Sequence, residues 1–286
     1  MKTLLSILLL ISNICYSQNT IIWSITDTIN NKKSFVVGTF HHIGNSFVDS
    51  IPELRAALLN SDVAIFESID DESKLIHTLQ KRKKQNKIEK LLSSQDFTKL
   101  KKLSKDWKVN LSILKPIEVL VKMRQEFQLT KCKTAKQTDK WKHFDNYLIA
   151  IAKQNKISMI GLETDSLQIN ILDDLEKSWS EEIISEEISF WIYKLTNEQN
   201  WYEECRETEQ YINFDIDYEF TNECEDDILV KKRNEEWMPM LLDLFRKKNC
   251  FLAVGLLHLK HTCGLLETFR RSGFKVKPIV IEKASR

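Results

Sequence analysis

Two stretches of the chain, Phe35-Val-Val-Gly-Thr-Phe-His41 and Leu252-Ala-Val-Gly-Leu-Leu-His258, repeat one pattern. In each stretch a short apolar run ends in glycine, and a histidine follows shortly after that glycine. Short apolar runs closed by glycine are typical of buried β-strands. Because parallel sheets bind ligands at the carboxyl ends of their strands, His41 and His258 are expected to face one cleft, although they lie near opposite ends of the chain.

Similar apolar runs lie outward from these two stretches and alternate with helical patterns. A polar turn around Asn30-Asn31 joins the first two expected strands, and helices are expected over 51–60, 144–154 and 264–271. Strands that alternate with helices pair in parallel through right-handed crossovers. The predicted fold class is therefore α/β, a mainly parallel central sheet with flanking helices and two Gly-x-x-His halves. The strands are expected at residues 21–26, 34–37, 62–67, 157–161, 251–255 and 275–281.

Long segments without glycine, rich in leucine and lysine, separate these strands. Their apolar spacing predicts helices over about 72–127 and 166–248, with a polar loop over 130–142. We interpret residues 72–142 as a helical insertion that caps the sheet. The length of the chain fits one large α/β domain, residues 18–286, better than two small ones.

Residues 1–17 have the order of a secretory signal peptide: Lys2, an apolar core over 4–11, and a cut after Ser17. The apolar core is too short to cross a bilayer, which takes roughly 20 apolar residues. An uncleaved anchor or a buried first strand is the alternative. We expect an exported protein, periplasmic or secreted, without stable membrane insertion once the signal is removed.

Charge and composition exclude some classes of partner. The chain has 42 Lys+Arg and 41 Asp+Glu, a formal net charge of +1. This balance gives no electrostatic reason to expect nucleic acid or an anionic membrane as a partner. The apolar fraction of 42% is that of a globular protein with a sizeable core.

Cysteine usage adds a constraint, because exported proteins fold where disulfides form. Five cysteines follow the predicted signal segment, so at least one stays free or pairs between chains. Cys250 opens an apolar strand and is expected in the core. Cys205 and Cys224 flank a polar stretch and are the disulfide candidate. No Cys-x-x-Cys occurs, which argues against a thiolate zinc site.

Four polar residues, His41, Glu67, Glu163 and His258, lie at or just past the ends of four expected strands. Imidazole and carboxylate are ligands of catalytic divalent metals, which keep an open position for water. We therefore expect a divalent metal ion, Mn, Co or Zn, on His41, His258 and Glu67. A second carboxylate such as Glu163 can then act in catalysis as the general base. Without a metal, a His–Glu pair can itself activate water.

Each of these residues also has a structural interpretation. A histidine after a strand is often a hydrogen-bonded structural residue, and Glu163 can cap the helix that follows it. Arg233 interrupts a helix otherwise full of acids and lysines; it can pair with Glu67 or Glu163, or be exposed. His42 is a spare neighbour of His41.

The ordered set of motifs resembles the TraB/GumN family, which is related to the Tiki proteases and, more loosely, to erythromycin-esterase-like proteins. The resemblance spans nearly the whole mature chain. It implies a sheet-centred α/β fold with paired Gly-x-x-His motifs, and metal-dependent peptide hydrolysis. Five stretches carry it: Ile22-Trp-Ser-Ile-Thr-Asp27, Gly38-Thr-Phe-His41, the block from Ile51-Pro-Glu-Leu54 to Ser61-Asp-Val-Ala-Ile-Phe-Glu67, Gly161-Leu-Glu-Thr-Asp-Ser-Leu-Gln168, and Arg233-Asn-Glu-Glu-Trp237 leading to Ala253-Val-Gly-Leu-Leu-His-Leu259 and Gly264-Leu-Leu266.

The resemblance also implies roles for individual residues. By motif match, His41, His258 and Glu67 carry the expected site. Asp145 matches less closely, because Phe144 stands where the family usually has glycine; the Pro-Gly turn expected after His258 is also missing. The residues expected to bind substrate or to support the site are Arg233, Gln168, Asp145 and His42, beside Glu163.

Three functions are compatible with these residues. The first is a metal-dependent hydrolase, a peptidase that acts on a peptide or protein substrate. The second is a non-catalytic ligand- or haem-binding protein on the same fold. The third is a metal-free esterase-like hydrolase that uses histidine and glutamate. Metal content separates the first from the third, and turnover of peptides separates the first from the second.

Overall fold

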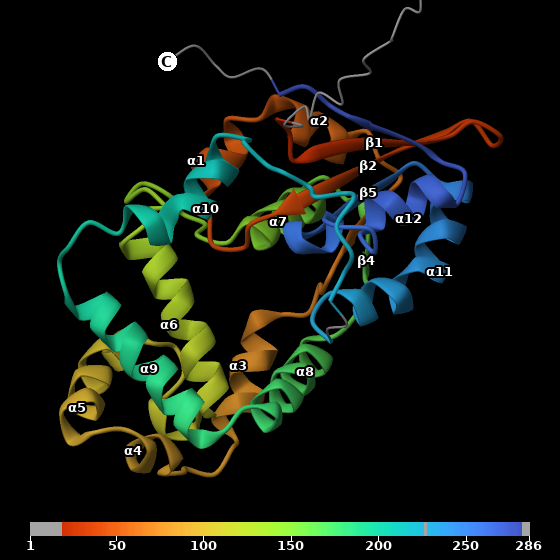
Figure 1. Cartoon of the computed structure of the whole chain (residues 1–286). Coiled ribbons are helices and arrows are strands. Elements are labelled where there is room, and N and C mark those ends of the chain that lie inside the picture. Colours follow the sequence, from red (N-terminus) through yellow and green to blue (C-terminus); the bar gives the residue numbers. More distant parts are fainter. Residues whose placement is uncertain (1–18, 226–227, 282–286) are drawn as a thin grey trace, which may run out of the picture.

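A single mixed sheet forms the centre of the molecule in the computed structural model, which describes residues 19–225 and 228–281 (Figure 1). The predicted signal segment, residues 1–17, lies outside the described residues. The strand order is β4-β3-β5-β2-β1-β6, and the predicted α/β class is confirmed. The strands are β1 (Ile22–Asp27), β2 (Lys32–Thr39), β3 (Val63–Phe66), β4 (Ser158–Gly161), β5 (Cys250–Gly255) and β6 (Lys275–Pro278).

Among the described strands of the sheet, β1 alone runs opposite to the others, and it lies between β2 and the edge strand β6. β2, β5, β3 and β4 pair in parallel, whereas β1 runs antiparallel to β2 and to β6. The reason is the short turn between β1 and β2, which returns the chain directly, as a hairpin does. Asp27 accepts hydrogen bonds from the backbone nitrogens of Ile29 and Asn30, at 2.9 and 3.2 Å. Asn31 has φ 53°, a left-handed conformation that asparagine tolerates well, so the predicted turn is confirmed.

Register brings the carboxyl ends of the parallel strands to the same edge. Thr39 at the end of β2 pairs with Gly255 at the end of β5. Phe66 at the end of β3 pairs with Ala253 on one side and with Gly161 on the other. Adjacent strands lie about 4.8 Å apart, so side chains just past these four ends can meet.

Helices cover the sheet and complete its core. Two helices follow β2 in the chain, α1 (Asn45–Asp49) and α2 (Pro52–Leu59), and α7 (Phe144–Gln154) precedes β4. Before and after β5 come α11 (Lys231–Lys247) and α12 (Leu265–Arg271). The central strands β3 and β5 are almost fully buried, and all residues of β3 are at most 1% exposed, whereas the edge strands β4 and β6 are partly exposed. This burial explains why the strands read as continuous apolar runs rather than as alternating ones.

A separate helical lobe lies to one side of the sheet (Figure 1). It has its own core, in which Leu100, Val119, Met123, Ile188 and Ile192 are buried. The block predicted over 72–127 is thus several helices, because polar side chains such as Ser93 cap new helix starts within it. The lobe consists of α3 (Glu72–Gln80), α4 (Lys87–Leu91), α5 (Ser94–Leu103), α6 (Pro116–Thr130), α8 (Asp165–Ser178) and α9 (Glu181–Thr196).

Two disulfides correct the pairing expected from the sequence. Cys132 bonds Cys205, and Cys224 bonds Cys263, so a Cys205–Cys224 bond is wrong. The physical reason is that α10 (Tyr202–Ile212) packs Cys205 beside Phe127 and Cys132 at the end of α6, whereas Cys224 lies in a later loop beside Cys263. Cys250 is a free, buried thiol, as expected for a core residue. Among the described residues, no helix is both long and apolar enough to cross a membrane.

Candidate functional site

Gly255 lies where the two Gly-x-x-His halves meet. A Cβ atom placed on Gly255 would lie 3.3 Å from Oε1 of Glu67, 3.4 Å from Nε2 of His41 and 3.7 Å from Cδ2 of His258. Side chains that follow β2, β3 and β5 therefore share one small space. The convergence expected from the strand pattern is present, and Gly255 leaves the room for it because glycine has no side chain.

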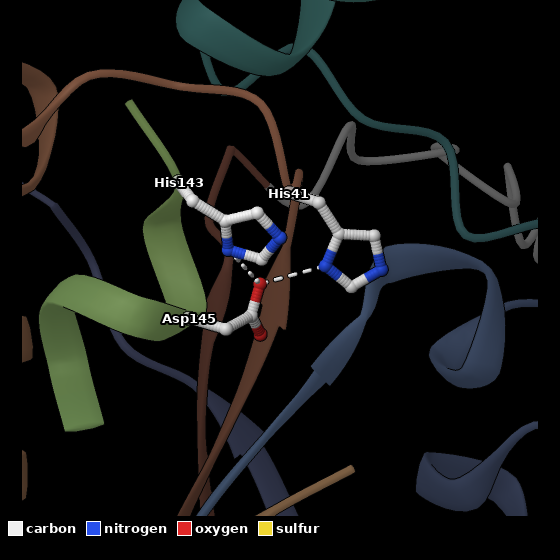
Figure 2. A group of neighbouring side chains, drawn as sticks. All are labelled: His41, His143 and Asp145. Atoms are coloured by element: carbon white, nitrogen blue, oxygen red, sulfur yellow. Dashed lines mark hydrogen bonds and ion pairs between the residues drawn. The ribbon is translucent and has the colours of Figure 1, made fainter. Parts of the chain in front are cut away.

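His41 is oriented by Asp145, which lies in the first turn of α7. Nδ1 of His41 lies 2.6 Å from Oδ2 of Asp145 (Figure 2). The other carboxylate oxygen accepts a hydrogen bond from the Thr39 hydroxyl at 2.9 Å. The backbone nitrogen of Phe144 also donates to the carbonyl of His41 at 2.8 Å, which ties the loop to the start of α7. With Nδ1 engaged, Nε2 of His41 is the atom left to face the cleft.

The charge state of His41 follows from this contact. Partial desolvation of the half-buried ring lowers its pKa, but the nearby Asp145 carboxylate raises it more, and the pKa of His41 reaches about 9. Burial alone would raise the pKa of Asp145, yet the same pair holds it well below its usual range. At neutral pH the pair is therefore an imidazolium on a buried carboxylate.

Two further histidines adjoin this pair. Nδ1 of His143 lies 3.7 Å from Oδ2 of Asp145, and the ring centroids of His143 and His41 are 5.5 Å apart (Figure 2). His42 meets His143 edge-on, with centroids 5.2 Å apart. Burial and the neighbouring histidines lower the pKa of His42, so its ring is neutral. His143 was not expected from the sequence; its position directly before α7, two residues before Asp145, is the signal that could have identified it.

Arg233 connects the two glutamates. Its Nη2 donates to Oε2 of Glu67 at 2.5 Å and also to Oε1 of Glu163, and its Nε donates to Oε2 of Glu163 at 3.1 Å. Gln168 donates to Oε1 of Glu163 at 2.9 Å. Arg233 therefore pairs with Glu67 and Glu163 at once, and the alternative of an exposed arginine is wrong. The side chains of Arg233, Glu67 and Glu163 are only 13%, 10% and 1% exposed.

Glu67 stays ionised inside this arrangement. Burial raises its pKa, but His258, His41 and Arg233, together with the backbone N–H of Gly255, lower it by more. That N–H donates to Oε1 of Glu67 at 2.7 Å. Burial lowers the pKa of Arg233, whereas the glutamates raise it further, so the guanidinium keeps its charge.

His258 lies in the short turn η3 (Leu256–Leu259) after β5 and is buried. Its Nδ1 lies 2.7 Å from Oδ1 of Asn234, and its Nε2 lies 3.2 Å from Nη1 of Arg233 and 3.7 Å from Oε1 of Glu67. The ring packs on Trp237 with centroids 4.6 Å apart. Burial is the main cause that lowers the pKa of His258, which falls to about 4. The charge of Arg233 also lowers this pKa, whereas the Glu67 carboxylate raises it. His258 is therefore neutral where His41 is charged.

A cleft of about 1070 Å³ opens over these residues. His41, Glu67, Arg233 and His258 line this cleft, together with many residues of the segment 205–224. This segment is bonded at both ends, through Cys205 to Cys132 and through Cys224 to Cys263. The lining residues from the segment are Arg206, Glu207, Gln210, Tyr211, Asp215, Ile216, Asp217 and Glu219.

The metal set expected from the sequence, His41, His258 and Glu67, does not fit a cation in this arrangement. Both oxygens of Glu67 already accept hydrogen bonds, one from Gly255 and one from Arg233. The guanidinium of Arg233 lies 3.2 Å from Nε2 of His258, where a second positive charge would be repelled. A different set, His41, His143 and Asp145, has ligand atoms within 4.8 Å of one another. Two imidazoles and a carboxylate are suitable donors for Mn, Co or Zn.

Comparison with known proteins gives one family. The model of the TraB/PrgY/gumN family matches residues 21–278, which is most of the chain and contains all the residues of the cleft described above. No curated protein and no solved structure matches the chain.

Proposed function

The chain belongs to the TraB/PrgY/gumN family, and from this premise we propose that it is an exported hydrolase that cleaves peptide bonds of a peptide or protein substrate in the cleft. One observation carries the proposal: His41, braced by Asp145, and the carboxylate of Glu67 face the same space over Gly255. An acid and a base whose pKa values are pushed apart at one site are the pair that such hydrolysis needs.

The roles of the two groups follow from their charges. Glu67 is ionised, so it can take a proton from a water molecule as that water attacks the substrate carbonyl carbon. His41 is protonated through Asp145, so its Nε2–H can protonate the leaving amine as the C–N bond breaks. The products gain one OH and one H from the water. Proton exchange with solvent then returns Glu67 and His41 to their starting states.

The cleft supports a chain-like substrate rather than a small ligand. Its volume of about 1070 Å³ lies slightly above that of pockets that enclose small molecules, roughly 300–1,000 Å³. Leu229 and Leu257, which line the cleft, are 37% and 61% exposed, and charged side chains of both signs line it as well. A mixed lining of this kind suits a peptide, which carries backbone hydrogen-bonding groups and varied side chains.

A cation-assisted form of the hydrolase is the second candidate, and the cluster of His41, His143 and Asp145 favours it. A divalent ion held there would acidify a water molecule and polarise the substrate carbonyl. Thr39 would keep the Asp145 carboxylate oriented, as outer partners of metal ligands do. In this form Glu67 would remain the general base, and Arg233 would remain bonded to Glu67 and Glu163.

The pH dependence of hydrolysis tests the acid role of His41. With a chelator present, kcat/KM is expected to fall as pH rises through about 9, because the required proton leaves His41. Replacing Asp145 with Asn removes the charge that raises this pKa, so the fall is expected to move to lower pH. A fall that lies at the same pH in both proteins would contradict the role of the His41–Asp145 pair. Hydrolysis that increases through pH 9 would identify His41 as a base instead.

A further inference from the structure

We infer that His258 is a positioning residue: its ring, fixed by Asn234, presents an acceptor nitrogen that holds Arg233 against Glu67. This inference deepens the proposed hydrolase, on which it rests for its catalytic consequence. It assigns Asn234 a role in the site and gives the second Gly-x-x-His histidine a task different from that of the first.

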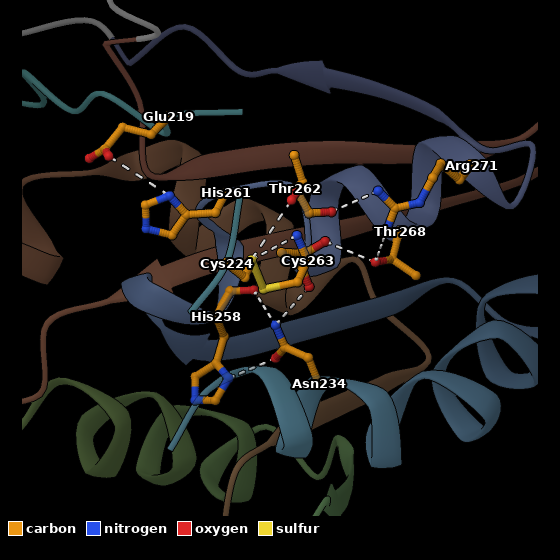
Figure 3. Close-up of a disulfide and its surroundings, with 10 residues drawn as sticks. Glu219, Cys224, Asn234, His258, His261, Thr262, Cys263, Thr268 and Arg271 are labelled. Carbon is orange, nitrogen blue, oxygen red and sulfur yellow. Dashed lines mark hydrogen bonds and ion pairs between the residues drawn. A yellow bond between two sulfur atoms is a disulfide. The ribbon is translucent and has the colours of Figure 1, made fainter. Parts of the chain in front are cut away.

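The orientation of Asn234 is set by its surroundings. Its Nδ2 lies 3.1 Å from the carbonyl oxygen of His258 and 3.2 Å from that of Cys263 (Figure 3). Carbonyl oxygens only accept, so this end of the side chain is the NH₂ group, and Oδ1 is the end that faces His258. Asn234 is 2% exposed, which leaves little water to substitute for these partners.

The tautomer of His258 follows directly. Oδ1 of Asn234 can only accept, so Nδ1 of His258 must carry the hydrogen across their 2.7 Å contact. In a neutral ring Nε2 then has a lone pair, and it accepts from Nη1 of Arg233 at 3.2 Å. Both nitrogens of the ring are thereby engaged, in contrast to His41, whose Nε2 faces the cleft.

Arg233 couples the position of the His258 ring to the positions of the Glu67 and Glu163 carboxylates. Nη1 also donates to the carbonyl of Leu229 at 3.0 Å, while Nη2 bonds Glu67 and Glu163. A guanidinium is a rigid planar fork, so fixing Nη1 also fixes the direction of Nη2. His258 therefore helps to decide where the Glu67 carboxylate lies and how strongly it stays ionised.

The ring and its supports are held from both sides. Trp237 packs on the ring of His258, and the guanidinium of Arg233 lies 4.8 Å from the centroid of the same indole. On the other side, the Cys224–Cys263 disulfide holds the loop whose Cys263 carbonyl orients Asn234 (Figure 3). This support makes the acceptor nitrogen a fixed part of the fold.

The test compares His258→Gln with His258→Ala. The carbonyl oxygen of glutamine can take the place of Nε2 as an acceptor for Arg233, whereas alanine leaves that donor without its partner. We expect alanine to lower kcat by about 10–100-fold and glutamine to recover most of that loss. A catalytic or metal-binding histidine would lose activity equally in both variants, and that result would overturn the inference. His77→Gln, on the exposed face of α3, is the matched control, and unfolding midpoints check that each variant folds.

A second measurement does not depend on turnover. Nitrogen NMR of histidine-labelled wild-type protein at neutral pH is expected to show His258 as the Nδ1–H tautomer. Asn234→Ala is expected to shift the ring toward a mixture of tautomers, because the acceptor for Nδ1–H is gone. An Nε2–H tautomer in the wild type would overturn the inference. If the wild-type protein cleaves no peptide, the proposed hydrolase fails, while the NMR result still decides the inferred contact.

Discussion

Replacing His41 with Ala is expected to lower kcat/KM by about 10²–10⁴-fold, the range supplied by a positioned general acid. The loss follows because Nε2 of His41 is the protonated group beside the Glu67 carboxylate over Gly255. Stability should change little by comparison, since the His41 side chain is 43% exposed and its partner Asp145 keeps the Thr39 hydroxyl. Steady-state kinetics on a cleaved peptide, together with thermal unfolding, measure both quantities.

The matched control for this variant is His77→Ala. His77 lies in the last turn of α3 and is exposed, outside the cleft. The His77→Ala variant should therefore have the same kcat/KM as the wild type. An activity within threefold of wild type in His41→Ala would contradict the acid role, and so would an unfolded variant, because the contact would then be mainly structural.

Replacing Arg233 with Met is expected to destabilise the fold by about 3–5 kcal/mol, the cost of leaving buried charge without its partner. Glu67 and Glu163 would then lie side by side with most of their compensating charge removed. Arg233 lowers the pKa of Glu67, so without it Glu67 would be protonated more easily, and the loss should be larger at pH 8 than at pH 5. Urea unfolding at the two pH values measures the effect.

The control removes all three charges at once. In Glu67→Gln/Glu163→Gln/Arg233→Met no buried carboxylate lacks a partner, so most of the lost free energy should return, although hydrolysis should not. A single Arg233→Met variant that loses less than about 1 kcal/mol, the value of an exposed ion pair, would contradict the burial of this group.

The sequence predicted the sheet well because its signals are local. All six expected strands are present, and the four polar residues expected at strand ends, His41, Glu67, Glu163 and His258, lie at one edge. The apolar runs and their glycines carry this information, because a fully buried strand has no other composition open to it.

The details of the site depend on side-chain directions, which periodicity does not carry. Asp145 was expected only through the resemblance, and its bond to His41 joins segments far apart in the chain. Nothing in the local sequence around Asn234 shows that its amide lies between His258 and Cys263. His42 and Gln168, expected as supporting residues, lie against His143 and Glu163.

The choice of metal ligands and of disulfide partners also depends on three-dimensional contacts that the sequence pattern does not carry. The expected ligands have the correct chemistry, but the guanidinium of Arg233 lies next to His258, a position visible only in three dimensions. Cys205 and Cys224 are near in sequence, yet packing of α10 against the end of α6 gives Cys205 another partner. Pairing of this kind depends on which surfaces meet, not on spacing along the chain.

Mass-spectrometric analysis of a mixed peptide pool tests the central claim most directly. The pool is incubated at neutral pH with wild-type protein and with His41→Ala, each in chelator and each with added manganese. The account predicts new peptide termini with the wild type and almost none with the variant. Cleavage that persists in chelator supports the Glu67–His41 pair acting alone, and cleavage that requires manganese supports the cation-assisted form. Absence of cleavage by the wild type under both conditions, or equal cleavage by the variant, would contradict the hydrolase.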